Sequence, residues 1–409
     1  MPETQNKIMW QAPWGYRESF SISVGLLFIG WLLEWFSNAP LVEIASYPTN
    51  RYMAVIWLTV GAVLFFTARK NFLVKWLSSV PAAIASVGLL ALLSLFLGFF
   101  AQTPNDTSIL GRLGISHMTD SWPFLIAILW VIICLEMAVL KRIRRFKWKD
   151  TWYILSHLGL LIAIIGGVFG APEVERLVMN AFEGRTIWMA QQPDGKMKEV
   201  PVAVKLINFD IEEYPPKLAI VDNTTGKVLE SMGKPQYQLM DEDTLQIWKY
   251  QIIVKKYYSM AAKVEKAYYP VETIGAAPAA LITTTRNGQT TEGWTYSGSL
   301  NFQPEALKIN SEHSLIMLPP EPKHYFSDAV VITPDQKRDS VRIRVNEAVK
   351  VNGWKIYQLD YDTDMGRWSN KSVLELVHDP WLPIVYIGIF MMIGGAIMLF
   401  WQGKNNSSK

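Results

Sequence analysis

Six stretches of this chain are long and apolar enough to cross a lipid bilayer, for which a helix needs ~20 residues. Hydrophobic residues make up 50% of the 409-residue chain and only 18% of residues are charged, whereas soluble proteins carry ~25% charged residues. The sequence therefore predicts a bundle of six transmembrane helices, at about 19–37, 53–68, 78–101, 123–140, 152–171 and 380–401.

The distribution of lysine and arginine predicts the orientation of these helices. The connections 69–77 and 141–151, together with the two termini, contain 13 basic residues, while the alternate connections 38–52 and 102–122 contain 2. Basic residues accumulate in the short cytoplasmic loops of membrane proteins. We therefore expect both termini on the cytoplasmic side and the long segment 172–379 on the outer side.

Residues 172–379 differ in character from the rest and predict a large β-rich domain between the fifth and sixth helices. Apolar and polar residues alternate there, as in strands that bury one face, in the runs 202–207, 245–254, 340–345, 353–359 and 372–377. Turn signals such as Asn287-Gly288 and Asn352-Gly353 separate such runs. The expected fold class is a six-helix membrane bundle with an extracytoplasmic, antiparallel, sandwich-like or barrel-like domain.

The single cysteine, Cys134, excludes several kinds of chemistry. One thiol cannot form an intramolecular disulfide, a CxxC redox pair, a cysteine-based zinc site or a CxxCH haem-attachment motif. The net charge of +3, with no basic stripe among aromatic residues, also argues against nucleic acid as a partner. No phosphate-binding glycine loop or HExxH motif is present.

His157 is the strongest candidate for a binding residue. It is the one imidazole in the fifth predicted helix, which contains no charged residue, and an ionisable side chain inside a spanning helix is a functional candidate. The residues alone leave two interpretations open: a hydrogen bond to Ser156, Glu136 or another helix, or ligation of a metal or haem iron. Because no other predicted helix core contains histidine, the opposite axial position of a bound haem would belong to a partner or stay open.

Four glycines of the same helix allow a flat ligand or a second helix to approach closely. They are Gly159, Gly166, Gly167 and Gly170.

The remaining polar residues near the helices have simpler interpretations. Glu34 lies near the outer end of the first helix, where we expect it to reach the lipid head groups. Glu136 precedes Lys141 by about one turn, so we expect its side chain to extend toward the basic connection. His313 and His324 are expected in surface loops and His378 at the membrane interface.

Several stretches between residues 78 and 401 carry a family resemblance. They are Ser121-Trp-Pro-Phe-Leu-Ile with the basic run after it, Ser156-His-Leu-Gly-Leu-Leu, Val200-Pro-Val-Ala-Val-Lys, Asn352-Gly-Trp-Lys-Ile-Tyr-Gln and Asp379-Pro-Trp-Leu-Pro-Ile. In this order and spacing the chain resembles the ResB family, also called CcsB, of system II cytochrome c biogenesis. The resemblance divides the chain into an added N-terminal hairpin (1–77), a three-helix core (78–171), a periplasmic β-rich domain (172–379) and a last helix with its tail (380–409).

The resemblance implies a function in cytochrome complex assembly at the bacterial inner membrane. ResB proteins act with a CcsA-type membrane protein as a holocytochrome c synthase, or haem lyase, which attaches haem to CxxCH apocytochromes c. The family's membrane histidine matches His157, which would bind the iron of haem b axially, with a CcsA histidine opposite. The resemblance assigns no catalytic residue to this chain. With a single cysteine, the chain implies a separate thiol-reducing partner.

A second function remains open at this stage. Helices with a large outer β domain are equally typical of a transporter or an export-complex permease that binds no cofactor.

Overall fold

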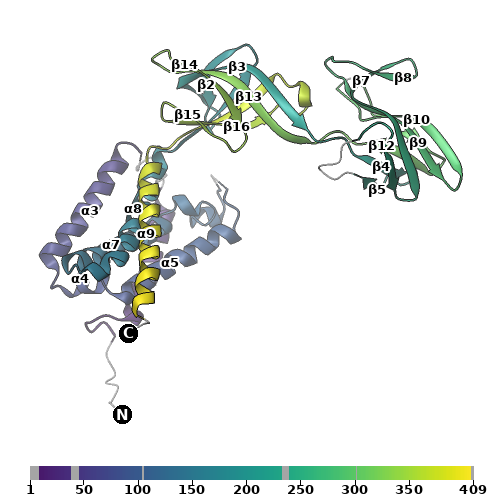
Figure 1. Ribbon diagram of the computed structural model, residues 1–409. Coiled ribbons are helices and arrows are strands. Elements are labelled where there is room, and N and C mark those ends of the chain that lie inside the picture. Colours follow the sequence, from purple (N-terminus) through teal and green to yellow (C-terminus); the bar gives the residue numbers. More distant parts are fainter. Residues whose placement is uncertain (1–8, 38–45, 104–105, 233–238, 301, 407–409) are drawn as a thin grey trace. The chain divides into compact units, whose positions relative to one another are not determined.

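The computed structural model describes residues 9–37, 46–103, 106–232, 239–300 and 302–406. The chain forms two compact units, a helical unit of Met1–Val174 with Asp379–Lys409 and a β unit of Glu175–His378. Figure 1 shows both units. Within the described residues, six helices are long and apolar enough to cross a membrane. They are α1 (Tyr16–Phe36), α3 (Thr49–Ala68), α5 (Val80–Phe99), α7 (Trp122–Arg144), α8 (Thr151–Gly170) and α9 (Leu382–Asn406).

These helices agree with the six predicted segments to within a few residues at most ends. The second helix begins at Thr49, four residues before the predicted start, so Arg51 lies inside its first turn. Short helical turns fill the connections: α4 (Phe72–Leu77), α6 (Ile109–Arg112), η1 (Met118–Asp120), η2 (Trp148–Asp150) and η3 (Ala171–Glu173).

Helix α7 is the centre of the helical unit. More than half of its apolar window is buried (56%), against 11–33% for the other five helices, and it packs against α1, α3, α5 and α8. Ser121 is its N-cap residue, and Pro123 lies in its first turn, where the missing N–H of proline costs no helical hydrogen bond. It ends in the basic residues Lys141, Arg142 and Arg144, whose charge complements the carbonyl end of the helix.

Helices α8 and α9 lie side by side along their length (Figure 1). A Cβ atom at Gly159 would lie 2.6 Å from the carbonyl oxygen of Gly388, and a Cβ at Gly388 would lie 2.5 Å from the carbonyl oxygen of Gly159. Only glycine fits at either position, since both backbones occupy that space. The pair is therefore held by close backbone contact, as in other small-residue helix interfaces.

The β unit contains one eight-stranded antiparallel sheet with the order β14-β13-β3-β2-β1-β17-β16-β15. Its first and last long strands along the chain, β1 and β17, pair over their full length from Glu175 opposite His378 to Phe182 opposite Lys371. The bounds are β1 (Glu175–Phe182), β2 (Thr186–Gln191), β3 (Met197–Glu213), β13 (Pro322–Ile332), β14 (Arg338–Arg344), β15 (Val349–Val351), β16 (Trp354–Tyr361) and β17 (Lys371–His378).

This sheet curls so that strands far apart in its order meet across a common core. Ser327 on β13 donates to Gln358 Oε1 on β16 over 2.6 Å and lies 2.7 Å from the Ser372 hydroxyl on β17. Ser372 also donates to Gln358 Oε1, over 3.2 Å. All three side chains are buried, so their hydrogen bonds satisfy polar groups that water does not reach.

The rest of the β unit is a two-sheet sandwich. One sheet has the order β11-β12-β4-β5 and the other β10-β9-β7-β6, with β8 paired to β7. Residues of both sheets, among them Ile220, Ile252, Ile282 and Leu315, form a single buried cluster. The bounds are β4 (Leu218–Asp222), β5 (Val228–Met232), β6 (Thr244–Ile247), β7 (Tyr250–Val264), β8 (Ala267–Pro270), β9 (Ala277–Arg286), β10 (Gln289–Tyr296), β11 (Leu307–Lys308) and β12 (His313–Met317).

The predicted turns at Asn287-Gly288 and Asn352-Gly353 are confirmed. All four residues have positive φ angles, and each pair joins two strands directly, β9 to β10 and β15 to β16. This is the geometry that favours Asn-Gly in two-residue hairpins. The run 245–254, predicted as one strand, is instead a hairpin of β6 and β7, because the chain turns at Trp248, whose φ is 51°.

The buried Ser327–Gln358–Ser372 group yields a stability prediction. Gln358→Leu removes the acceptor of two buried hydroxyl groups, and an unsatisfied buried hydroxyl costs ~1–3 kcal/mol. We expect a lower free energy of unfolding by about that amount, measured by denaturant unfolding of the purified chain. The control is Gln251→Leu on the exposed face of β7, where we expect a change below ~0.5 kcal/mol. Equal effects of the two substitutions would contradict the assignment.

Candidate functional site

His157 lies on the second turn of α8 with one ring nitrogen held by the backbone. Its Nδ1 is 2.9 Å from the carbonyl oxygen of Tyr153, one turn earlier. The imidazole also stacks on the Tyr153 ring, with 3.7 Å between centroids and an interplanar angle of 19°. Together the two contacts hold the position and the orientation of the ring.

The hydrogen bond determines which nitrogen of the neutral imidazole carries the proton. A carbonyl oxygen only accepts, so Nδ1 donates and Nε2 keeps a free lone pair. Among the described residues, Nε2 has no hydrogen-bond partner. An imidazole held through Nδ1–H by a carbonyl, with Nε2 free, is the usual arrangement of a histidine that ligates a metal.

The expected alternatives for His157 involved Ser156 and Glu136, and the structure pairs it with neither. Ser156 donates to the carbonyl oxygen of Trp152 over 2.8 Å. Glu136 is buried against α3, where a Cβ at Gly61 would lie 2.1 Å from its Oε2 atom. The expected extension of Glu136 toward the basic connection is thus wrong, because Gly61 leaves room for the carboxyl group inside the bundle.

The glycines of α8 serve helix packing and leave His157 on a different face. Gly159 and Gly166 contact α9 through Gly388 and Val385, and Gly170 contacts Trp381 just before α9, while Gly167 faces open space. Nine residues, or about two and a half turns, separate His157 from Gly166. The imidazole therefore points roughly away from α9. The sequence predicted that either a flat ligand or a second helix would pack against these glycines, and in the structure it is a second helix, α9.

Glu34 is a structural link between two helices. Its Oε1 lies 2.9 Å from His117 Nε2 and its Oε2 accepts the backbone N–H of Trp122, the first residue of α7, over 2.8 Å. A carboxylate at this position stabilises a helix N-terminus. Glu34 and His117 thus tie α1 to the start of α7, a role that their positions 83 residues apart did not suggest.

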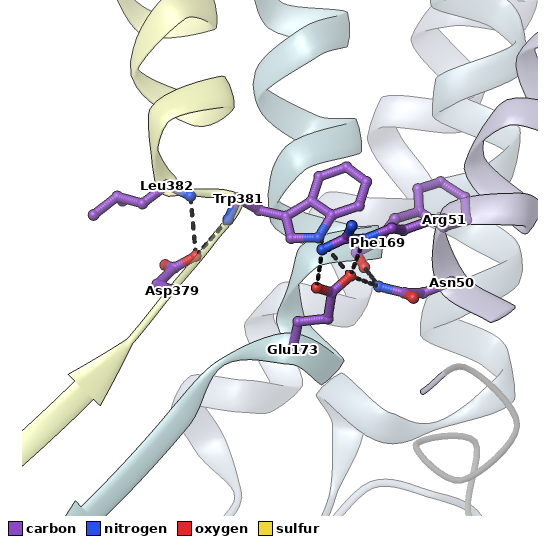
Figure 2. Close-up of polar contacts among 7 residues, drawn as sticks. All are labelled: Asn50, Arg51, Phe169, Glu173, Asp379, Trp381 and Leu382. Atoms are coloured by element: carbon purple, nitrogen blue, oxygen red, sulfur yellow. Dashed lines mark hydrogen bonds and ion pairs between the residues drawn. The ribbon is translucent and has the colours of Figure 1, made fainter. Parts of the chain in front are cut away.

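A larger polar network lies within the helical unit (Figure 2). It joins the start of α3 to the two segments of this unit that adjoin the β unit in the sequence, one after α8 and one before α9. Glu173 accepts hydrogen bonds from Asn50 Nδ2 over 2.7 Å, from Arg51 Nη2 over 2.6 Å and from Trp381 Nε1 over 2.8 Å. Asn50 also donates to the carbonyl oxygen of Phe169 over 2.7 Å. One carboxylate thereby holds the start of α3, the end of α8 and the segment before α9 together.

Asp379 completes the start of α9 beside this network (Figure 2). Its Oδ1 accepts the backbone N–H groups of Trp381 and Leu382, over 3.1 and 3.0 Å. This is helix N-capping by an aspartate, and it orients Trp381 toward Glu173.

The three histidines of the β unit have different surroundings. His313 was expected in a surface loop, but it lies on β12 and is buried, with Nδ1 3.2 Å from the Tyr250 hydroxyl. His324 is exposed on β13. His378 ends β17 and packs against the Trp354 ring, 5.2 Å between centroids.

No protein-family model matches the chain, and no curated protein sequence matches it. Within the described ranges, no group of three or more His, Cys, Asp or Glu side chains is placed to hold a metal ion. The candidate site is therefore the single imidazole of His157 with Tyr153 beneath it.

The Glu173 network yields a second stability prediction. Glu173→Ala removes the acceptor of three donors, two of them from the buried Asn50 and the part-buried Trp381, and we expect a loss of ~1–3 kcal/mol in the free energy of unfolding. The Arg51 contribution is small because that side chain is 49% exposed. Thermal unfolding of the purified chain in detergent measures the loss.

Two variants separate the causes of that loss. Glu173→Gln keeps an acceptor for Asn50 and Trp381 but removes the charge, so we expect it to retain most of the stability. Asp194→Ala removes a carboxylate from an exposed pair with Lys196 and should leave the stability nearly unchanged, because solvent screens such a pair. A loss for Asp194→Ala as large as for Glu173→Ala would contradict the proposed role of the network.

Proposed function

We propose that this chain is the haem-handling subunit of a system II cytochrome c synthase of the ResB type. It would bind haem in the membrane and help to deliver it to the outer face, where a CcsA-type partner attaches it to apocytochrome c. The observation that carries this proposal is the free Nε2 lone pair of His157 inside an apolar helix. The resemblance of the stretches around Ser121, Ser156, Asn352 and Asp379 supports it independently.

The surroundings of His157 suit a haem iron as cargo. Its side chain is half-buried, so part of it is accessible from the side of α8. The hydrogen bond from Nδ1 to the Tyr153 carbonyl fixes the direction of Nε2. When bound, the haem would supply the iron, the porphyrin and the vinyl groups for attachment, while this chain orients and retains it.

A second axial ligand would come from the partner. The chain has 5 histidines. None except His157 lies on a helix that could span the membrane, and His117 is already paired with Glu34. A CcsA-type histidine approaching the exposed side of α8 would complete the six-coordinate iron.

The proposal places the six helices in the bacterial inner membrane, with both termini in the cytoplasm and the β unit outside. The 13 to 2 distribution of basic residues supports this orientation. The β unit would then meet apocytochrome c and its thiol-reducing partner on the outer side. The lone Cys134 is buried in α7, which leaves it no access to substrate thiols.

The deciding experiment compares visible spectra of the purified complex with a CcsA-type partner. Wild type is expected to show a haem absorption band and His157→Ala to lose most of it, because an axial ligand is removed. His324→Ala, an exposed histidine on β13, is the matched control and should keep the band. Restoration of the band in His157→Ala by free imidazole would identify axial ligation.

Two results would contradict the proposal at different levels. A band that persists in His157→Ala without imidazole would overturn the residue assignment. No haem band in wild type, with or without the partner, would overturn haem handling and favour the transporter or permease instead.

A further inference from the structure

A cavity of about 510 Å³ lies where α7 ends and α8 begins. Five basic side chains and one carboxylate line it: Lys141, Arg142, Arg145, Lys147, Lys149 and Asp150. Ser78 and Tyr153 also contribute to its wall. The cavity therefore combines a basic lining with a position at the end of two apolar helices.

Of the five cations, Arg142 alone has a carboxylate partner among the described residues, and Lys141, Arg145, Lys147 and Lys149 have none. Arg142 is 3.4 Å from Asp150 and lies over the Tyr153 ring. Among the described residues, no carboxylate lies within ion-pair distance of Arg145, Lys147 or Lys149. The positive charge of the cavity thus exceeds what the chain itself neutralises.

Orientation in the membrane explains the number of basic residues but not the cavity. Arg69, Lys70 and Arg144 meet the same requirement for positive charge, yet they do not line this space. Lys141 is held toward the cavity wall by a 3.1 Å hydrogen bond to the carbonyl oxygen of Ser78. The grouping of cations around one hollow needs its own explanation.

Guanidinium and ammonium groups in such a grouping bind phosphate and carboxylate oxygens. The exposed aromatic residues Phe146 and Trp148 flank the site, and such residues prefer the membrane interface. We propose that the cavity binds the anionic head group of a membrane-resident amphiphile through its phosphate or carboxylate oxygens. Basic pockets at the ends of membrane helices bind lipid head groups in this way.

Two sources could supply those oxygens, a phospholipid phosphate or the two propionates of haem. The first does not depend on the proposed function. The second rests on it, and one contact links the two sites: Tyr153 lines the cavity and stacks on His157.

The test compares two triple variants of the full chain, purified in neutral detergent. Arg145→Gln, Lys147→Gln and Lys149→Gln remove three of the four unpaired charges of the cavity and keep Lys141, which is held by Ser78. Arg69→Gln, Lys70→Gln and Arg144→Gln remove the same charge elsewhere on the same predicted side. Binding of phosphatidylglycerol and of phosphatidylcholine is measured by native mass spectrometry, and haem and haem dimethyl ester are titrated by absorbance.

A phospholipid site predicts roughly 100-fold weaker phosphatidylglycerol binding in the cavity variant, with the control variant unchanged, since each basic residue near the surface contributes ~1 kcal/mol. A propionate site predicts the same loss for haem but not for its dimethyl ester, whose carboxylates are blocked. Either result supports an anionic head-group site. Equal binding of every ligand by the cavity and control variants would overturn it.

The outcome is separable from that of the proposed function. His157→Ala tests iron ligation and leaves the cavity intact. A cavity effect on phosphatidylglycerol alone, with no haem band in wild type, would uphold the head-group site while overturning haem handling.

Discussion

The cost of leaving a polar side chain without a partner among apolar helices organises the helical unit. Transfer of an unpaired polar group into an apolar environment costs several kcal/mol. Key polar side chains of this unit therefore lie where a neighbouring helix or connection offers a hydrogen-bond partner. Glu34 meets the start of α7, and Glu173 collects donors from α3 and from the segment before α9. Glu136 is the exception: its Oε2 atom is buried without a hydrogen-bond partner among the described residues, in the space that Gly61 of α3 leaves free. In the first two cases a polar residue fixes which helices are neighbours.

These contacts explain how the N-terminal hairpin is attached. Helices α1 and α3 present mostly apolar surfaces, and apolar contacts alone specify little inside a membrane because lipid tails are equally apolar. Glu34 on α1 and Asn50 on α3 supply directional bonds to α7, α8 and their connections. Helices α1 and α3 are therefore bonded to α7 and α8 at specific residues.

The helices were largely predictable and their polar links were not. A run of ~20 apolar residues has few alternatives to a spanning helix, so the six segments and the structure differ mainly at their ends, as at Thr49. The Asn50–Glu173 bond joins residues 123 apart in sequence, and no local pattern signals such a pair. His157 was identifiable as a candidate from its type and place, but its hydrogen bond to Tyr153 depends on a side-chain rotamer that only the structure shows.

In the β unit, too, features set by neighbouring residues were predictable from the sequence, and pairings between distant residues were not. Asn-Gly pairs determine turn geometry within two residues, and both predicted turns are present. By contrast, β3 pairs with β13 and β1 with β17, across more than a hundred residues in each case. Alternation of apolar residues predicts that a strand buries one face, but it does not choose the neighbouring strand. The curled eight-stranded sheet beside a sandwich was therefore beyond what the pattern determines.

The packing of α8 constrains how any partner reaches His157. Its glycine face is filled by α9, and the opposite side presents Tyr153, His157 and Leu160, while Ile164 at the same helical spacing packs against the cluster that contains Ala54 and Ile132. A helix that supplied a second ligand would have to approach along this side, since a Cβ-sized group already has no room between α8 and α9 at Gly159. The same side leads through Tyr153 to the basic cavity. The free Nε2 atom of His157 and the Tyr153 ring thus follow one another along this side of α8, and unpaired cations of the cavity lie beyond them, in the connection before α8.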